Sequence, residues 1–256
     1  VLIIGATSSI GRALMMNFVE NGANVVMAGR KENLDEFVRK EIWEINEINY
    51  ETKYTDPSFA TEITTHPDLD FLFINSGVQR MFDLSKPPSI DLDILDTELL
   101  MNYTSNVHLT HAILPHLWNK FTQTAIAYTT SQMPLVPMIG CPKYRVSKAG
   151  LYQFILGLRT RVAAGSERVK VVEVYPPAVQ RELRGAQHHA DLKDGHLVGM
   201  PLGEFVDKVW ERLRSGEEQI AVGSAGGIYN VFEVKMQELY RDMTEVSTGL
   251  LKVFLR

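Results

Sequence analysis

Val1-Leu2-Ile3-Ile4-Gly5-Ala6-Thr7-Ser8-Ser9-Ile10-Gly11 opens the chain and sets how the residues after it can fold. Its four leading apolar residues predict a buried strand, and its glycines predict a tight turn into a helix from Arg12 to about Asn21. Gly22 ends that helix, and Asn24–Ala28 is predicted to be a second strand. A strand, a glycine-rich turn, a helix and a strand, in this order, are the context of a dinucleotide-binding site.

The turn itself is the first predicted binding site. Glycine lets the backbone approach a pyrophosphate, which sits at the positive N-terminus of the following helix. An ordinary glycine-containing turn is the alternative, but the strand and the helix on either side favour nucleotide binding. The residues predicted to hold the cofactor here are Gly5, Thr7, Ser8, Ser9, Ile10 and Gly11.

The residues after the second predicted strand indicate which dinucleotide binds. NAD sites commonly carry Asp or Glu at this point, about 20 residues on, to bind the ribose 2′-hydroxyl. This chain instead has Arg30 and Lys31. No carboxylate there repels a 2′-phosphate, and a guanidinium can pair with one, so we predict NADP(H). A solvated basic loop is the alternative.

Two later strands end in further candidate cofactor contacts. Asp56, at the end of a strand predicted around Tyr50–Tyr54, either accepts a hydrogen bond from the adenine amino group or caps the next helix. Asn75-Ser76-Gly77 follows the apolar strand predicted over Asp70–Ile74. These small residues would let the backbone approach the cofactor.

The rest of the chain continues an alternation of strands and helices. Further strands are predicted at 124–130, 169–175 and 219–222, and helices at 31–46, 91–118, 144–161 and 202–214. This order predicts an α/β fold, a Rossmann-type doubly wound parallel sheet of about seven strands with helices on both faces. No linker rich in Pro, Gly or Ser divides residues 1–256, so we predict a single domain.

Composition excludes several classes of function. The 256 residues are 45% hydrophobic and 22% charged, which suits a globular domain with a sizeable core. A net charge of −5 argues against nucleic-acid binding. The one cysteine, Cys141, leaves no intrachain disulfide and favours a reducing, cytoplasmic location. No apolar run reaches the ~18 residues that span a bilayer. The chain starts without an initiator Met, and we expect no signal peptide.

Tyr144-Arg145-Val146-Ser147-Lys148 is the predicted catalytic stretch. A tyrosine and a lysine four residues apart lie on one face of a helix. A tyrosine hydroxyl is a poor base at neutral pH, and a neighbouring ammonium group stabilises its phenolate. Ser131, at the end of the strand predicted at 124–130, could bond a substrate oxygen while Tyr144 moves the proton. The spacing alone is common, and its weight comes from the rest of the chain.

Other segments have less specific patterns. The apolar loop Met133–Ile139 either packs under its neighbours or lines a substrate pocket. The polar, glycine-containing segment 180–200 resembles a lid over a site, and its two histidines lack nearby ligand partners, so no metal site is predicted. The tail at 229–256 is predicted to be helical, docked on the body or on a partner subunit. Asn102, inside the helix predicted at 91–118, is either bonded to backbone or an incidental surface residue.

In order and spacing, these pieces resemble the short-chain dehydrogenase/reductase family over essentially the whole chain. The matching pieces are the Gly5–Gly11 turn, Asn75-Ser76-Gly77, Asn102, Ser131, Tyr144 with Lys148, and Pro176-Pro177-x-Val179. More narrowly, Asn75–Arg80, Leu109-Thr110, Leu114–Leu117 and Pro176–Gln180 are similar to the DltE-type oxidoreductases of that family.

The resemblance implies hydride transfer between the nicotinamide C4 and a carbonyl or alcohol carbon. It implies that Tyr144 is the acid/base, that Ser131 positions the substrate oxygen, and that Lys148 assists Tyr144 and binds the nicotinamide ribose. It also implies that Asn102 holds a water in the proton relay behind Lys148. The resemblance further implies that Pro176 and Val179 belong to a segment that contacts the cofactor. Family members usually form homodimers or homotetramers through the long helices, here 91–118 and 144–161, so we expect a homo-oligomer.

Three residues depart from the family pattern. Ser9 replaces the usual glycine in the middle of the turn, and Ser76 stands where alanine is usual. Arg181 replaces a threonine that normally contacts the cofactor, and it could either pair with the pyrophosphate or disturb nicotinamide binding.

Two hypotheses for function follow. The first is an NADP(H)-dependent oxidoreductase that interconverts a carbonyl and an alcohol on a small apolar or aromatic substrate. The second is a catalytically impaired NADP(H)-binding sensor or interaction protein. The complete set of Asn102, Ser131, Tyr144 and Lys148 argues against the second. Too few residues follow Lys148 for the larger substrate domain of an extended epimerase.

Overall fold

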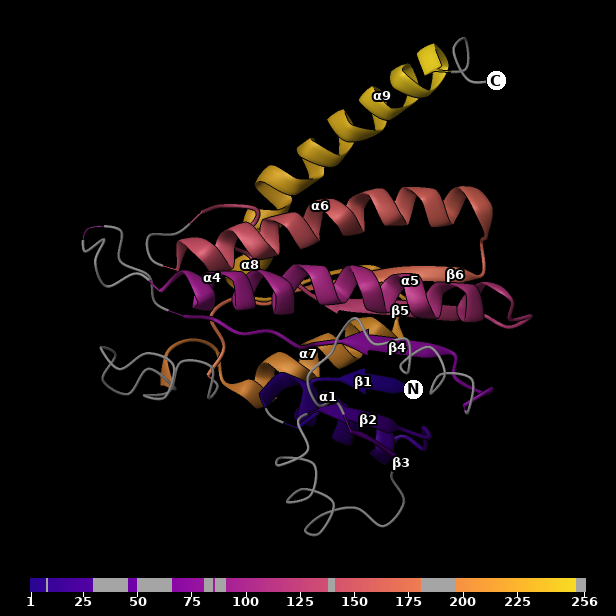
Figure 1. Ribbon diagram of the computed structural model, residues 1–256, viewed down its shortest axis with the longest axis vertical. Helices are drawn as coiled ribbons and strands as arrows, with labels where there is room; N and C mark the ends of the chain where they lie inside the picture. The colour runs from indigo at the N-terminus through magenta and orange to yellow at the C-terminus, as the bar shows by residue number, and fades with distance from the viewer. Residues whose placement is uncertain are drawn as a thin grey trace.

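Seven parallel strands form one sheet that carries helices on both faces (Figure 1). The structure is a computed structural model that describes residues 1–7, 9–29, 46–49, 66–80, 85, 91–137, 141–180 and 197–251. The strand order is β3-β2-β1-β4-β5-β6-β7, so the winding direction reverses between β1 and β4. The predicted single-domain, doubly wound α/β fold is confirmed.

The elements alternate along the chain as the sequence predicts. The strands are β1 (Leu2–Ile4), β2 (Val26–Gly29), β3 (Asn46–Asn49), β4 (Phe71–Ile74), β5 (Thr124–Thr129), β6 (Val169–Tyr175) and β7 (Gln219–Ala221). The described helices are α1 (Ser9–Glu20), α4 (Leu92–Leu99), α5 (Ser105–Trp118), α6 (Pro142–Gly165), α7 (Leu202–Arg214), α8 (Ser224–Ile228) and α9 (Val234–Leu251). Two π-helical turns, η2 (Leu100–Thr104) and η5 (Tyr229–Glu233), connect α4 to α5 and α8 to α9.

Two predicted elements differ from the structure. The third strand lies at Asn46–Asn49 rather than around Tyr50–Tyr54, which falls outside the described residues. This edge strand is polar and is defined by its backbone pairing with β2, so an apolar pattern could not locate it. The helix predicted at 91–118 is interrupted by η2, where Asn102 lies.

The core has one apolar layer on each face of the sheet. Successive strand residues point to opposite faces, so Leu2 and Ile4 join one layer while Ile3 joins the other. The first layer packs on α5 and α6, and the second packs on α1 and α7. Helix residues buried in these layers include Leu109, Ile113, Leu151 and Ile155 on one face, and Ile10, Leu14, Phe205 and Val209 on the other.

The turn between β1 and α1 is packed too closely for side chains at its glycines. Gly5 has a φ of +77°, and a Cβ on it would lie 2.9 Å from the Ser76 backbone nitrogen. A Cβ on Gly11 would overlap the Gly5 carbonyl oxygen and lie 2.7 Å from Nδ2 of Asn75. The two glycines therefore allow α1 to approach β1 and β4.

A buried network of acids joins β6 to the C-terminal helices. Glu173 on β6 has no exposed surface; it accepts a 2.8 Å hydrogen bond from the Tyr175 hydroxyl and lies 3.4 Å from Arg159. Glu233 in η5 accepts hydrogen bonds of 2.9 Å to each carboxylate oxygen from the hydroxyl of Tyr152 on α6. Burial raises the pKa of Glu173 to about 7 against the opposing effect of Arg159, and burial also raises the pKa of Glu233. Burial therefore shifts both acids toward the protonated form in the folded chain.

We expect Glu173→Gln to weaken the dependence of stability on pH. The folded chain holds the Glu173 proton up to about pH 7, whereas the unfolded chain releases it near its ordinary pKa of 4.5. The wild-type free energy of unfolding should therefore fall as pH rises from about 5 to about 7, because the unfolded state binds fewer protons. Denaturant unfolding across this range measures the slope, which should be shallower in Glu173→Gln and partly retained through Glu233.

The control for this experiment is Glu245→Gln, which makes the same chemical change on an exposed face of α9. It should leave the slope as in the wild type. A wild-type slope in Glu173→Gln as well would contradict the assignment.

We expect Gly11→Ala to destabilise the fold through the overlap with Gly5. The opposing atom is backbone and cannot rotate away, so the loss in free energy of unfolding should be roughly 1–3 kcal/mol or more. Gly157→Ala is the matched control, because a Cβ there meets nothing within 4 Å. It should be neutral or stabilising by up to about 1 kcal/mol, since alanine favours a helix. Thermal unfolding followed by circular dichroism compares the two, and equal stability would contradict the packing argument.

Candidate active site

The predicted site residues gather at the carboxyl ends of the strands. Gly5 follows β1, Asn75 follows β4, Ser131 lies two residues beyond β5, and Pro176 follows β6. In doubly wound sheets, ligands bind at this edge, where the strand order reverses. The reversal here lies between β1 and β4, which end in the turn and in Asn75.

The turn after β1 leads from the edge of the sheet to the N-terminus of α1. Asn75 holds it from the neighbouring strand, because its Nδ2 donates to the Gly5 carbonyl (3.3 Å) and its Oδ1 accepts from the Thr129 hydroxyl (2.9 Å). Helix α1 starts at Ser9 and has no acidic residue in its first turn, so its positive end is not neutralised there. The side chain of Ile10 is buried in the core, which leaves only its backbone for a phosphate.

Ser9 adopts a backbone conformation that favours glycine. Its φ is +48°, in the left-handed region, where a side chain typically costs about 1 kcal/mol or more. This explains why glycine is the residue expected at this point of the turn. The chain therefore accepts local strain at its predicted phosphate site.

Tyr144 and Lys148 lie in the first turns of α6, and both are buried. The Lys148 ammonium donates a 2.8 Å hydrogen bond to the Thr129 carbonyl and lies 5.9 Å from the centre of the Tyr144 ring. Gly77 is the close neighbour on the other side, because a Cβ there would lie 3.5 Å from Lys148 Nζ and 3.2 Å from Asn102 Oδ1. The backbone at Gly77 thus passes close to Lys148, the predicted catalytic lysine.

Ser131 is held at the end of β5. Its hydroxyl accepts a hydrogen bond from the Met133 backbone N–H (3.2 Å), and the residue is 7% exposed. Thr129, two residues earlier on the same strand, bonds both Lys148 and Asn75. One strand end therefore connects the predicted catalytic and cofactor residues.

Asn102 is a buried structural bridge rather than a surface residue. Its side chain accepts from the Val78 N–H and donates to the Val78 carbonyl, both at 2.8 Å. It also donates to the Ser147 hydroxyl at 3.0 Å, and Ser147 in turn donates to the Tyr144 carbonyl at 2.9 Å. Of the two alternatives that the sequence left open, bonding to backbone is therefore the observed one.

Sequence reasoning missed three polar residues around this site: Thr129, Ser147 and Glu98. Glu98 on α4 is 1% exposed, and burial raises its pKa to about 7 against the opposing charges of Lys143 and Arg80. Its only sequence signal is its position, four residues or about one helical turn before Asn102. Its opposing cation, Lys143, immediately precedes Tyr144. Nothing in its residue type distinguishes it from a surface glutamate.

Several predicted site residues lie outside the described part of the chain. These are Ser8, Arg30, Asp56 and the lid residues 181–196, including Arg181. The flanks of the lid are described: Val179 is buried and forms an isolated parallel bridge with Met200, while the Pro176 carbonyl accepts a 3.1 Å hydrogen bond from Gln132. The roles of Pro176 and Val179 toward a cofactor stay predictions.

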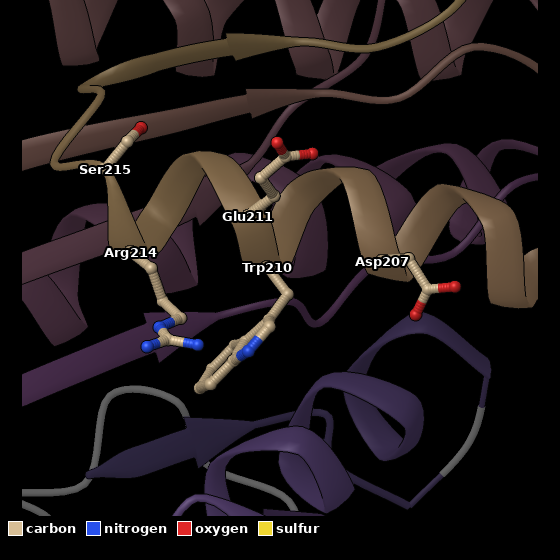
Figure 2. A pocket seen from close by; sticks show the side chains of 5 residues that line it. All are labelled: Asp207, Trp210, Glu211, Arg214 and Ser215. Atoms are coloured by element: carbon tan, nitrogen blue, oxygen red, sulfur yellow. The ribbon is translucent and has the colours of Figure 1, made fainter.

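An open groove on α7 lies away from this site. Figure 2 shows Asp207, Trp210, Glu211, Arg214 and Ser215 along it. Trp210 and Arg214 also line an adjoining hollow together with Asp70 and Thr124. Asp70 precedes β4 and Thr124 begins β5, so this hollow lies at the amino ends of the strands, opposite the predicted site. The described residues contain no cluster of potential metal ligands, and none of their helices is long and apolar enough to cross a membrane.

The chain is similar to known proteins over most of its length. Residues 1–191 match the short chain dehydrogenase family. The chain is 27% identical over 251 residues to the uncharacterized oxidoreductase DltE of Bacillus subtilis (strain 168), covering 95% of each chain. It is 29% identical to the serine 3-dehydrogenase of Agrobacterium fabrum over 68% of this chain and 70% of that one.

Solved structures share the fold at low sequence identity. A short-chain dehydrogenase from Burkholderia cenocepacia, in complex with NADP, has a TM-score of 0.72 at 21% identity, covering 100% of this chain and 96% of that one. One from Sphingobium yanoikuyae, in complex with NADPH, has a TM-score of 0.76 at 20% identity, covering 94% of each. With the match over residues 1–191 and this arrangement of Tyr144, Lys148 and the glycine turn, the chain belongs to the short-chain dehydrogenase/reductase family of oxidoreductases.

Proposed function

We propose that the protein is an NADP(H)-dependent oxidoreductase that interconverts a carbonyl and an alcohol on a small, apolar or aromatic substrate. The observation that carries this proposal is the position of Lys148, which bonds Thr129 and faces Gly77 while lying one helical turn from Tyr144. An ammonium group in this place can stabilise the negative charge that would form on Tyr144, and it can also bind a cofactor ribose. The chain's membership of an oxidoreductase family supports the same reaction class.

The residues at the strand ends fit a dinucleotide. Close packing at Gly5 and Gly11 holds the turn against the backbone around it, and the N-terminus of α1 would offer its positive end to the diphosphate. Bound there, the cofactor would supply or accept the hydride. Arg30, which follows Gly29 in the sequence, supports the choice of NADP(H), as do the relatives solved with NADP and NADPH. A Burkholderia phymatum relative of the same fold was solved with NAD, so the coenzyme needs its own test.

The chain's own groups would then move the proton. Tyr144 donates it to the carbonyl oxygen in reduction and removes it from the alcohol in oxidation. Ser131 holds that oxygen by a hydrogen bond, and Lys148 stabilises the negative charge that forms on Tyr144. Asn102 keeps the end of β4 and the start of α6 in register through Val78 and Ser147. The apolar loop after Ser131, which begins at Met133, is the proposed source of preference for an apolar substrate.

We expect Tyr144→Phe to abolish turnover while leaving NADPH affinity nearly unchanged. The variant loses the proton donor but keeps the ring and every described bond of Lys148. The assay follows loss of NADPH absorbance with a panel of diketones, quinones, aldehydes and ketosteroids, and fluorescence titration measures NADPH affinity. Tyr152→Phe is the control on the same helix, because its hydroxyl bonds Glu233 instead. Full turnover in Tyr144→Phe would contradict the mechanism, whereas tight binding of NADPH by the wild type without turnover on any panel member would favour the sensor hypothesis.

We expect Arg30→Ala to weaken NADPH binding far more than NADH binding. The guanidinium would pair with the 2′-phosphate that only NADPH carries, and loss of such a charged hydrogen bond costs about 1.5–3 kcal/mol, a factor of roughly 10 to 150 in the dissociation constant. Titration of both coenzymes against wild type and variant measures the difference. Arg168→Ala, before β6 at the opposite edge of the sheet, is the matched control. An equal loss for both coenzymes would remove the argument for NADP(H).

A further inference from the structure

Helix α9 extends away from the body of the molecule. In Figure 1 it rises beyond α6, and only its first turns lie near the rest of the chain. Its base is anchored: Met236 packs against the cluster of Tyr152 and Tyr175, and Gln237 donates a 2.6 Å hydrogen bond to Glu233. Every side chain from Arg241 to Leu250 is exposed except Thr244, which is partly exposed.

The exposed part of α9 carries a regular apolar stripe. We call this the α9 stripe; it consists of Met236, Leu239, Met243, Val246 and Leu250. Successive members are three, four, three and four residues apart, which is a repeat of 3.5 residues. Beyond Met236 they are 54%, 70%, 62% and 63% exposed, respectively. A sustained 3.5-residue repeat keeps one seam facing a second helix, so its spacing matches helix-on-helix packing.

A helix with this sequence is poorly stabilised in solvent without a partner. In proteins most of the stability of a helix comes from packing of its apolar face rather than from helix propensity. The distal half of α9 also contains Thr244, Val246, Thr248 and Gly249, all weak helix formers. Packing of the α9 stripe is therefore the interaction that would keep this segment helical.

The charge of α9 favours a protein partner over a membrane surface. Between Val234 and Leu251 the helix has two basic and three acidic side chains, a net charge of −1. Lys235 is paired within the helix with Glu238 at 3.2 Å. A helix that lies on an anionic membrane needs a basic polar face, which this one lacks. None of the charged residues lies on the stripe, so two such stripes can meet without burying a charge.

We propose that the α9 stripe is a self-association surface that packs against α9 of a second copy of this chain. A two-fold pair presents the same stripe from both copies, equal in length and uncharged. Met236 already belongs to the core cluster at the helix base, so the pair would extend an existing apolar core outward. This surface is separate from the long helices α4, α5 and α6 and does not depend on the proposed reaction.

Sedimentation equilibrium on the full chain tests the proposal. Leu239→Glu combined with Met243→Glu places charge in the seam and should halve the mass of the wild-type assembly. Arg241→Glu combined with Thr248→Glu is the matched control on exposed positions off the stripe and should keep the wild-type mass. A monomeric wild type, or the same mass in all three proteins, would overturn the proposal.

Cysteine cross-linking locates the contact independently of any other subunit interface. Cys141 is buried and is the one cysteine in the sequence, so Met243→Cys introduces a single exposed thiol. Mild oxidation should convert Met243→Cys into a covalent dimer and leave Thr248→Cys monomeric in denaturing gels. Equal cross-linking of both variants, or of neither, would overturn the assignment. Binding of a monomeric wild type to neutral phospholipid vesicles would replace the second copy with a lipid surface.

Discussion

The arrangement of the site depends on the three hydrogen bonds of one buried amide, that of Asn102. Two of them join both backbone polar groups of Val78, as a neighbouring strand would, and the third reaches Ser147 on α6. The end of β4, the π-helical turn η2 and the start of α6 are therefore held by one side chain. A buried amide with all these partners is stable, whereas loss of one partner would leave a polar group unsatisfied in the core. The π-helical turn is where α4 and α5 meet, and it places this amide between the strand end and α6.

Buried ionisable side chains form two groups, one around Lys148 and one around Glu173 and Glu233. Lys148 is buried beside Thr129 and Gly77, at the place where we propose that the cofactor and Tyr144 react. Glu173 and Glu233 are buried farther along α6, and burial raises the pKa of both. Tyrosine hydroxyls donate to one oxygen of Glu173 and to both oxygens of Glu233. In the proposed function, the first group supplies the positive charge beside Tyr144. The second uses acids as hydrogen-bond acceptors that anchor the base of α9.

Two helices that border the predicted site begin at a residue with strained backbone. Ser9 and Cys141 both have positive φ values, and they stand at the start of α1 and α6, respectively. At these points the chain enters a helix through a residue with left-handed backbone, a conformation in which glycine is usual. The surrounding packing holds both residues in place. Strained backbone next to a ligand site is common in enzymes, because the rigid scaffold can sustain it.

The sequence by itself determined the order of elements, the β1–α1 turn and the family, because these depend on local features: apolar periodicity, glycine positions and the four-residue spacing of Tyr144 and Lys148. It placed β6 and α7 at the bounds that the structure shows, since both have apolar residues in a regular period. It misplaced β3, whose polar residues are a strand only through pairing with β2. Only the tertiary structure decided that Asn102 bridges Val78 and Ser147, that Glu98 and Glu173 are buried, and that α9 stands away from the body. Each of these depends on which distant residues meet in space, and a polar side chain has the same local sequence signal whether it faces water or a buried partner.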